Sequence, residues 1–320
     1  MKKLENCQWK PRWVAHLGCV KGCLDYLGID LSDAWLYGGT GHAFVINLHQ
    51  QVCPSGPTAW RTMKLFELGA NLGYRIEGVL GFKGQDDFSE VQKRAWDHAR
   101  QAIDQGLPCY GWELDIPEFY VVHGYDDVGY YYSGPGCTEG KGPKPWQELG
   151  DTGIGVLELH SVQPGEVADD ATTVKQALSF ALEHAASPKE WIFEGYKAGP
   201  AGFDNWIGAL QAGVASDMGT RYNAGVWLEC RKNAVGFLEE AKGRLAGWAD
   251  ALFDDALAHY RVVAESLGKV AEVYPWTFEA SDEDVLPVDD RSRAAIQVLQ
   301  AARDAESAGL RALDKIVQAL

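Results

Sequence analysis

The stretch PEFYVVHGYDD, residues Pro117 to Asp127, predicts a buried strand that runs into a turn. Tyrosine, phenylalanine and valine favour strands, and the flanking Pro, Gly and Asp residues mark turns. Similar runs lie nearby at residues 74–82, 108–114, 129–134 and 154–162. Because most of these runs are joined by short turns, they predict a mainly antiparallel sheet.

The flanking sequence predicts helices. Short helices are expected at residues 19–28 and 32–38, a longer one at 55–73, and an amphipathic one at 89–106. After residue 163 the pattern is helical throughout, with an apolar stripe from Val226 to Leu252 and another in the last thirty residues. We therefore expect an α+β domain over residues 1–163 and an all-α helical bundle over 164–320.

Composition limits the partners and the compartment. The 320 residues carry 29 Lys and Arg against 45 Asp and Glu, a formal net charge of −16. This excess argues against nucleic acid and against anionic membranes, which select basic surfaces. The first residues, MKKLENCQWK, include no apolar run typical of a secretion signal, and no apolar segment has membrane-spanning length. We expect a cytoplasmic protein.

The seven cysteines have no repeating spacing, which indicates reduced thiols. Cys19 and Cys23 are not accompanied by a second pair, so neither zinc nor any other metal or cofactor is predicted. Gly18-Cys19 is expected where a loop enters a helix, and the helix dipole and free backbone N–H groups there favour a thiolate and an oxyanion. The alternative is a buried, inert thiol, the common fate of cysteine.

Three segments carry a resemblance: HLGCVKGCLDYLG (16–28), YGGTGHAF (37–44) and GLPCYGWELDIPEFYVVHGYDD (106–127). They are similar to the papain-like cysteine peptidase and acyltransferase superfamily. The branch they resemble includes the double-glycine leader peptidases and the N-terminal domain of butirosin-biosynthesis protein H. The helical second half resembles extensions found beside such domains. The resemblance implies a papain-like fold for the first domain.

The same resemblance implies a catalytic triad that this chain does not complete. Cys19 takes the place of the nucleophile. The general base, a histidine six residues before Gly124, is replaced by Glu118. The orienting residue on the next strand is replaced by Ser133 or Gly134. The resemblance thus implies a degenerate triad.

Nearby histidines are candidates for the missing base. Strand alternation places His123 on the face opposite Glu118, so it is interpreted as a core or turn histidine with Asp126 or Asp127 as its partner. His42 follows a glycine-rich turn and is the preferred substitute base. His16, three residues before Cys19, is a second candidate and a candidate substrate contact.

Other side chains are candidates for binding a substrate. Trp60, Trp112 and Tyr120 would line an aromatic cleft, although core packing is the ordinary role of such residues. Asp115 is expected to be aimed by the turn at Pro117.

Three functions follow as hypotheses. The first is a thiol-dependent acyltransferase or amide hydrolase that acts on a small molecule or peptide, by analogy in a biosynthetic pathway. The second is a degenerate papain-like domain in which Glu118 binds an amine-bearing or peptide ligand without turnover. The third is an enzyme in which Glu118 and Asp115 act as acid and base. The helical domain is the expected surface for any homo-oligomer.

Overall fold

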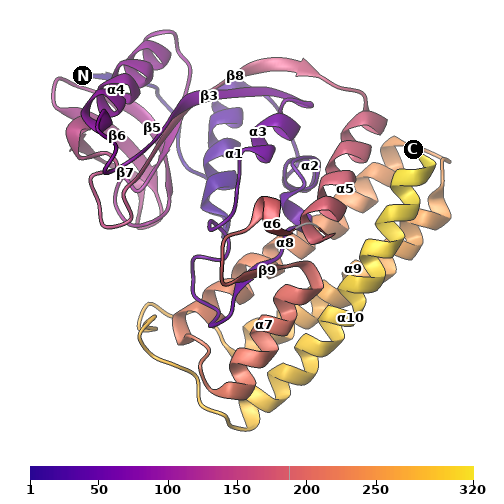
Figure 1. Ribbon diagram of the computed structural model, residues 1–320. Helices are drawn as coiled ribbons and strands as arrows, with labels where there is room; N and C mark the ends of the chain where they lie inside the picture. The colour runs from indigo at the N-terminus through magenta and orange to yellow at the C-terminus, as the bar shows by residue number, and fades with distance from the viewer. Residues whose placement is uncertain (187) are drawn as a thin grey trace. The chain divides into compact units, whose positions relative to one another are not determined.

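The computed structural model describes all residues except Ser187, and its fold is α+β (Figure 1). The chain forms two compact units. Unit 1 contains Met1–Ser32 and Leu72–Val167, and unit 2 contains Asp33–Asn71 and Ala168–Leu320. The predicted boundary at residue 163 lies near the last change of unit, between Val167 and Ala168, but residues 33–71 group with the helical unit. Local sequence patterns do not reveal this long-range packing.

Unit 1 is built on a sheet whose strands lie in the order β3-β8-β4-β5-β6-β7, with β1 paired to β5. Every strand pair is antiparallel, as the sequence predicts. The strands are β1 (Lys2–Lys3), β3 (Leu72–Phe82), β4 (Cys109–Trp112), β5 (Phe119–Tyr125), β6 (Gly129–Gly134), β7 (Cys137–Pro145) and β8 (Val156–Val167). The sequence did not predict β7, because its two glycines and two prolines resemble a loop.

Two helices cover opposite faces of this sheet. On one face lies α1 (Ala15–Leu27), where the ring of His16 stacks on Phe119 of β5. On the other lies α4 (Phe88–Asp104), where Trp96 packs edge-to-face against Tyr130 of β6. The short helix η2 (Trp146–Glu148) follows β7. Successive residues of a strand therefore contribute alternately to an α1 face and an α4 face.

Unit 2 is predominantly helical, and its long helices are joined by shorter elements. The long helices are α5 (Asp170–Ala186), α7 (Gly199–Ala212), α8 (Asp217–Arg244), α9 (Asp250–Val273) and α10 (Asp290–Ala319). The shorter elements are α2 (Asp33–Gly39), η1 (His42–Phe44), α3 (Lys64–Gly69), α6 (Pro188–Trp191) and the antiparallel strands β2 (Asn47–His49) and β9 (Tyr196–Ala198). The predicted helical character of this region is confirmed.

Two helix predictions in unit 2 need correction. The apolar stripe that ends at Leu252 does not form one helix, because Ala249 adopts a left-handed φ of 56° between α8 and α9. The helix predicted at residues 55–73 is reduced to α3. Upstream of it, the Asn47 side chain donates to the carbonyl groups of Gly56 and Ala59, which holds this segment as turns.

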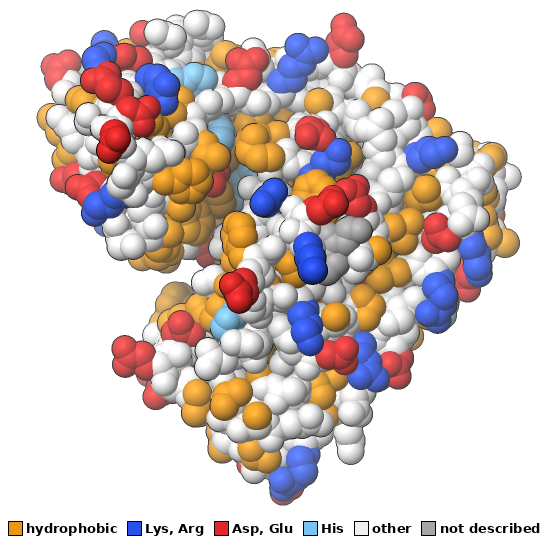
Figure 2. Space-filling view, in the orientation of Figure 1, with side chains coloured by type: hydrophobic (Ala, Val, Ile, Leu, Met, Phe, Trp, Pro, Cys, Tyr) orange, Lys and Arg blue, Asp and Glu red, His pale blue; other side chains and the backbone are white. Residues whose placement is uncertain are grey.

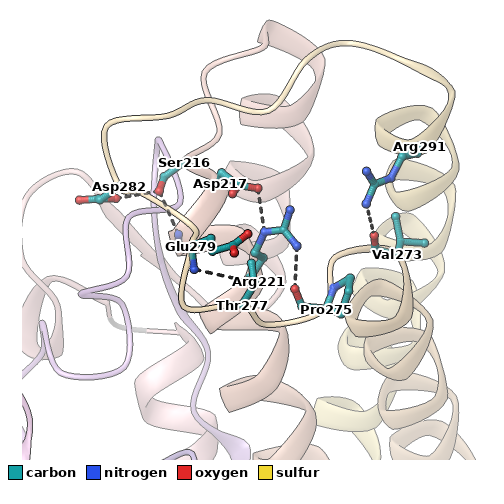
Figure 3. A network of polar contacts seen from close by, with 10 residues as sticks. Ser216, Asp217, Arg221, Val273, Pro275, Thr277, Glu279, Asp282 and Arg291 are labelled. Atoms are coloured by element: carbon teal, nitrogen blue, oxygen red, sulfur yellow. Dashed lines mark hydrogen bonds and ion pairs between the residues drawn. The ribbon is translucent and has the colours of Figure 1, made fainter. Parts of the chain in front are cut away.

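A long connection between α9 and α10 is fastened to the start of α8, as Figure 3 shows. The Arg221 guanidinium donates to the Asp217 carboxylate and to the Pro275 carbonyl. The Ser216 hydroxyl caps α8 and also donates to Asp282 at 2.7 Å. These bonds satisfy polar groups at a helix end and fix the path of the connection.

The core of unit 2 contains a buried ion pair. The side chains of Arg231 in α8 and Glu306 in α10 are both 0% exposed, and their N–O distance is 2.8 Å. The guanidinium makes two hydrogen bonds to Glu306, and it donates further to the carbonyls of Ala43, Phe44 and Val45. All five N–H donors of Arg231 are therefore used, and one side chain joins α8, α10 and η1.

The surface carries charges of both signs. In the face shown in Figure 2, acidic and basic side chains are interspersed rather than gathered into one large field. Many form exposed ion pairs, such as Lys93 with Asp97 and Lys269 with Glu265. Such pairs contribute little to stability. Among the helices that the structure describes, none combines the length and the apolar character needed to cross a bilayer.

The buried ion pair yields the first prediction. Glu306→Gln keeps the side-chain shape but leaves the Arg231 charge without its counterion, so it is expected to lower the free energy of unfolding by about 3 kcal/mol. Urea denaturation followed by circular dichroism measures this loss. The matched control is Glu272→Gln on the exposed surface of α9, expected to change stability by less than about 0.5 kcal/mol. Equal effects of both variants would refute a central role for the pair.

Candidate functional site

The position of Cys19 differs from the sequence prediction. Helix α1 begins at Ala15, so Cys19 lies in its second turn rather than at its start. The free backbone N–H groups of a helix belong to its first turn, and the amide of Gly18 already donates to the Val14 carbonyl. The helix terminus therefore does not offer the Cys19 sulfur the stabilisation of thiolate and oxyanion that the sequence suggested.

The surroundings of Cys19 favour the protonated thiol. The residue is 0% exposed. Burial raises its pKa well above the usual value, and the negative charge of Glu118 raises it further. The Glu118 carboxylate therefore acts on the Cys19 thiol electrostatically. Its effect is opposite to that of an imidazolium, which would favour the thiolate.

Unit 1 contains three further buried thiols. Cys7, Cys23 and Cys109 are all buried and all free. The Cys23 thiol donates to the Cys109 carbonyl at 3.8 Å, and its pKa is raised by burial and then by a hydrogen bond with Cys7. This group of thiols forms part of the unit 1 core, in line with the predicted inert role of Cys23.

The N-terminal segment packs along α1 near these thiols. A methyl group on Gly18 would lie 2.4 Å from the Lys10 carbonyl oxygen, and one on Gly22 would lie 2.1 Å from that of Gln8. Only glycine permits this close approach. The Trp9 amide donates to the Ser133 hydroxyl at 3.0 Å. Ser133, a candidate for the orienting position, thus holds the N-terminal segment against β6.

The loop between β4 and β5 positions the two candidate carboxylates. It is closed where the Glu113 amide donates to the Glu118 carbonyl at 2.8 Å, with Glu113 in a left-handed φ of 57°. Glu118 is half-buried and directly precedes β5. The Asp115 carboxylate forms an ion pair with Lys141 of β7, with an N–O distance of 2.8 Å. The loop therefore gives Asp115 a partner of its own within unit 1.

Two candidate binding residues lie on the α1 face. His16 Nε2 is 3.1 Å from the Tyr110 hydroxyl, and its ring centroid is 4.7 Å from that of Phe119. Trp112 packs edge-to-face on Phe119 at 5.0 Å. Its indole Nε1 is buried and has no hydrogen-bond partner among the described residues. A buried donor of this kind is costly unless a ligand or water satisfies it.

Tyr120 lies on the opposite face from these residues. Its ring packs edge-to-face on Tyr132 at 5.4 Å, and its hydroxyl donates to the Pro135 carbonyl at 3.2 Å. Tyr120 and Trp112 were expected to line one cleft. Because Tyr120 is on the α4 face, the structure does not bring it together with His16 and Trp112.

His123 occupies a bulge that the sequence did not predict. The register of β5 and β6 shifts between Val122 and Gly124, which leaves His123 as the extra residue. Burial, followed by the charge of Lys3, lowers its pKa to about 4. Asp126, one of its two predicted partners, instead accepts a hydrogen bond from Tyr131 at 2.8 Å.

The remaining two candidates, His42 and Trp60, belong to unit 2. His42 begins η1 after Gly41, whose φ of 78° confirms the tight turn. Its Nδ1 lies 3.5 Å from the Cys230 sulfur, and burial lowers its pKa to about 4. Trp60 Nε1 donates to the Pro57 carbonyl at 2.8 Å, and its ring centroid is 5.8 Å from that of His42. Within unit 2, the thiol beside His42 is Cys230.

Sequence reasoning missed several residues of this arrangement. Tyr110, which faces His16, was not singled out. His160 Nε2 lies 3.1 Å from Glu158, and the His160 ring is 5.3 Å from that of Tyr110. The alternation of ELH at residues 158–160 places the Glu and His side chains on one face of a strand, so this pair was readable from the sequence.

No protein-family model matches the chain, and no curated protein matches it. Within residues 1–186 and 188–320, no group of three or more His, Cys, Asp or Glu side chains is arranged to hold a metal ion. The geometry of the residues described above therefore carries the functional argument.

The burial of the thiols predicts an order of alkylation. Cys53 and Cys137 are partly exposed and are expected to react with iodoacetamide in the native protein, whereas Cys19 and Cys23 react only on unfolding. Peptide mass spectrometry over time measures each rate at pH 7 and pH 9. Rapid native alkylation of Cys19 near neutral pH would contradict the assignment of a buried, protonated thiol.

The buried histidines of unit 2 predict acid sensitivity. Burial holds the pKa of His42 at about 4 and that of His184 at about 3, against 6.5 for an ordinary histidine. The unfolded chain binds these protons first, so stability present above pH 6.5 is lost as the pH falls, by about 1.4 kcal/mol per pH unit for each histidine.

A substitution tests this pH dependence. The Nε2 atom of His184 is buried without a hydrogen-bond partner in the described part of the chain, and its ring packs edge-to-face on Trp60 and Phe180. His184→Phe is therefore expected to fold and to reduce the loss of stability between pH 6.5 and pH 4. Urea denaturation at several pH values measures the slope. An unchanged slope would show that His184 is not protonated on unfolding.

Proposed function

We propose that unit 1 is a papain-like module that binds an amine-bearing small molecule or peptide without turning it over. The observation that carries this proposal is the environment of Cys19, a fully buried thiol whose pKa is raised by burial and by the carboxylate of Glu118. A cysteine nucleophile reacts as the thiolate, and this environment favours the thiol.

The order of helices and strands along the chain supports the proposal that unit 1 is papain-like. Helix α1 carries Cys19 and packs against an antiparallel sheet whose strands come later in the chain. Glu118 directly precedes β5, where the resemblance implies a histidine. The substitution removes a base but retains a negative charge near the thiol. Such a change suits recognition of a cation better than proton transfer from sulfur.

Side chains at the start of β5 and beside it suggest the ligand chemistry. Glu118 supplies a carboxylate for an ammonium group, and Phe119 supplies an aromatic ring. The buried Nε1 of Trp112, which has no partner among the described residues, is a donor for a carbonyl or other acceptor. Trp112 and Phe119 are direct cross-strand neighbours. A primary amine that also carries an aromatic ring or a carbonyl group, as a peptide does, would match these groups.

Substitution of Glu118 tests the proposal. Phenethylamine and a dipeptide with a free amino terminus, Gly-Phe, serve as probes, and binding is followed by isothermal titration calorimetry. Glu118→Gln is expected to weaken binding about tenfold or more, because a buried or half-buried charge-assisted hydrogen bond contributes about 1.5–3 kcal/mol. Cys19→Ala is expected to change affinity less than twofold, since the thiol makes no essential contact.

The control is Glu139→Gln, an exposed carboxylate of β7 in the same unit. Equal affinities of the Glu118 and Glu139 variants would exclude Glu118 as the ligand contact. Incubation of the probes with protein should leave them chemically unchanged. Hydrolysis of an amide or transfer of an acyl group that disappears in Cys19→Ala would instead establish the thiol-dependent acyltransferase or amide hydrolase.

A further inference from the structure

The sheet of unit 1 has one edge strand whose backbone groups point outward. Strand β3 pairs with β8 in a constant register from Tyr74 to Phe82, and among the described residues it has no other strand partner. The Lys83 amide points toward β8 and donates to the Gly155 carbonyl, which continues the β3–β8 hydrogen bonds. The Phe82 amide points away from β8 and donates to the Gln85 side chain. Because backbone direction alternates, the even-numbered residues of β3 present their N–H and C=O groups outward.

The two edges of the sheet differ in their protection. At the far edge, β7 contains Pro143 and Pro145, which lack N–H groups, and its lysines discourage pairing. Strand β3, with the sequence LGYRIEGVLGF, contains no proline. Its side chains Leu80 and Phe82 are 46% and 47% exposed. An unprotected edge with exposed apolar side chains is a surface for strand addition.

The charges on β3 are self-complementary. Arg75 and Glu77 are both exposed and lie two residues apart on the same face. In an antiparallel pair of identical strands, a twofold axis at residue 75 or 77 would place like charges opposite each other. An axis at Gly78 would place both charges opposite uncharged residues, and one at Val79 would place Arg75 opposite Lys83. An axis at Leu80 would place Glu77 opposite Lys83, but the Lys83 ammonium is already paired with Asp151. An axis at Ile76 places Arg75 opposite Glu77 of the second copy, and does so twice.

We propose that two copies of this chain pair through β3, antiparallel about a twofold axis at Ile76, and so join their sheets into one. In this register Ile76 meets its own copy, and Gly78 meets Tyr74. These residues carry the outward-pointing backbone groups, so the pairing satisfies them. Leu80 lies opposite Leu72 of the second copy, which covers part of its exposed surface. The pairing is isologous, as closed dimers require.

The experiment uses charge reversal and charge exchange in the full chain. Sedimentation equilibrium is expected to show a dimer of the unmodified protein. Arg75→Glu and Glu77→Arg each place like charges opposite each other twice, and each is expected to weaken dimerisation at least about tenfold. The double variant, R75E with E77R, restores both opposite-charge pairs and is expected to return the dimer. Both side chains are exposed, so the variants should fold.

The matched control is Arg94→Glu, an exposed charge of α4 in the same unit, which should leave dimerisation unchanged. Hydrogen exchange at the amides of Ile76 and Gly78 provides a second readout, with protection that rises with protein concentration and is lost in Arg75→Glu. A monomer at all concentrations would overturn the proposal. So would a dimer that the single reversals do not weaken, as expected of pairing through the helices of unit 2, or a double variant no better than either single one.

Discussion

The arrangement of unit 2 depends on burying one guanidinium with every donor satisfied. A charge removed from water costs several kcal/mol unless it is paired and fully hydrogen-bonded. Arg231 meets this condition because its N–H groups donate to Glu306 and to the three consecutive carbonyls of residues 43–45. Those carbonyls belong to η1 and to Val45, which follows it. A helix this short has few internal hydrogen bonds of its own. The ion pair therefore determines the position of η1, and with it the placement of His42 beside Cys230.

In unit 1, the arrangement depends on close contact between the backbone of α1 and the N-terminal segment. Gly18 and Gly22 lie one turn apart on α1, and each allows the N-terminal segment to approach within a distance that a side chain would forbid. The segment is anchored at its other side by the Ser133 hydroxyl. The space beside the Cys19 turn is thus occupied by the chain itself. This explains why a cysteine that resembles a nucleophile is buried like a core residue.

The sequence predicted the features that depend on local periodicity. The strand GYYYSG was predicted with the bounds that β6 has, and the helix expected at residues 89–106 corresponds to α4. Features that depend on distant partners were not predictable. Arg231 and Glu306 are 75 residues apart in the chain, and neither stands out from the charged residues around it. The failure of the helix at 55–73 has the same origin, because Asn47 captures its carbonyls from outside the segment.

The candidate site shows how strand alternation both informs and misleads. Alternation correctly separates Phe119 from Tyr120, but it does not reveal which face receives α1, so Tyr120 was assigned to the wrong side. It also fails at His123, where the bulge interrupts the period. At Glu118 the important quantity is the sign of the charge rather than the direction of the side chain. The negative charge of Glu118 and the burial of Cys19 each disfavour the thiolate, so their effects add. Under the proposed function, the carboxylate that disfavours the thiolate is also the group that binds a cation, so one residue accounts for both properties.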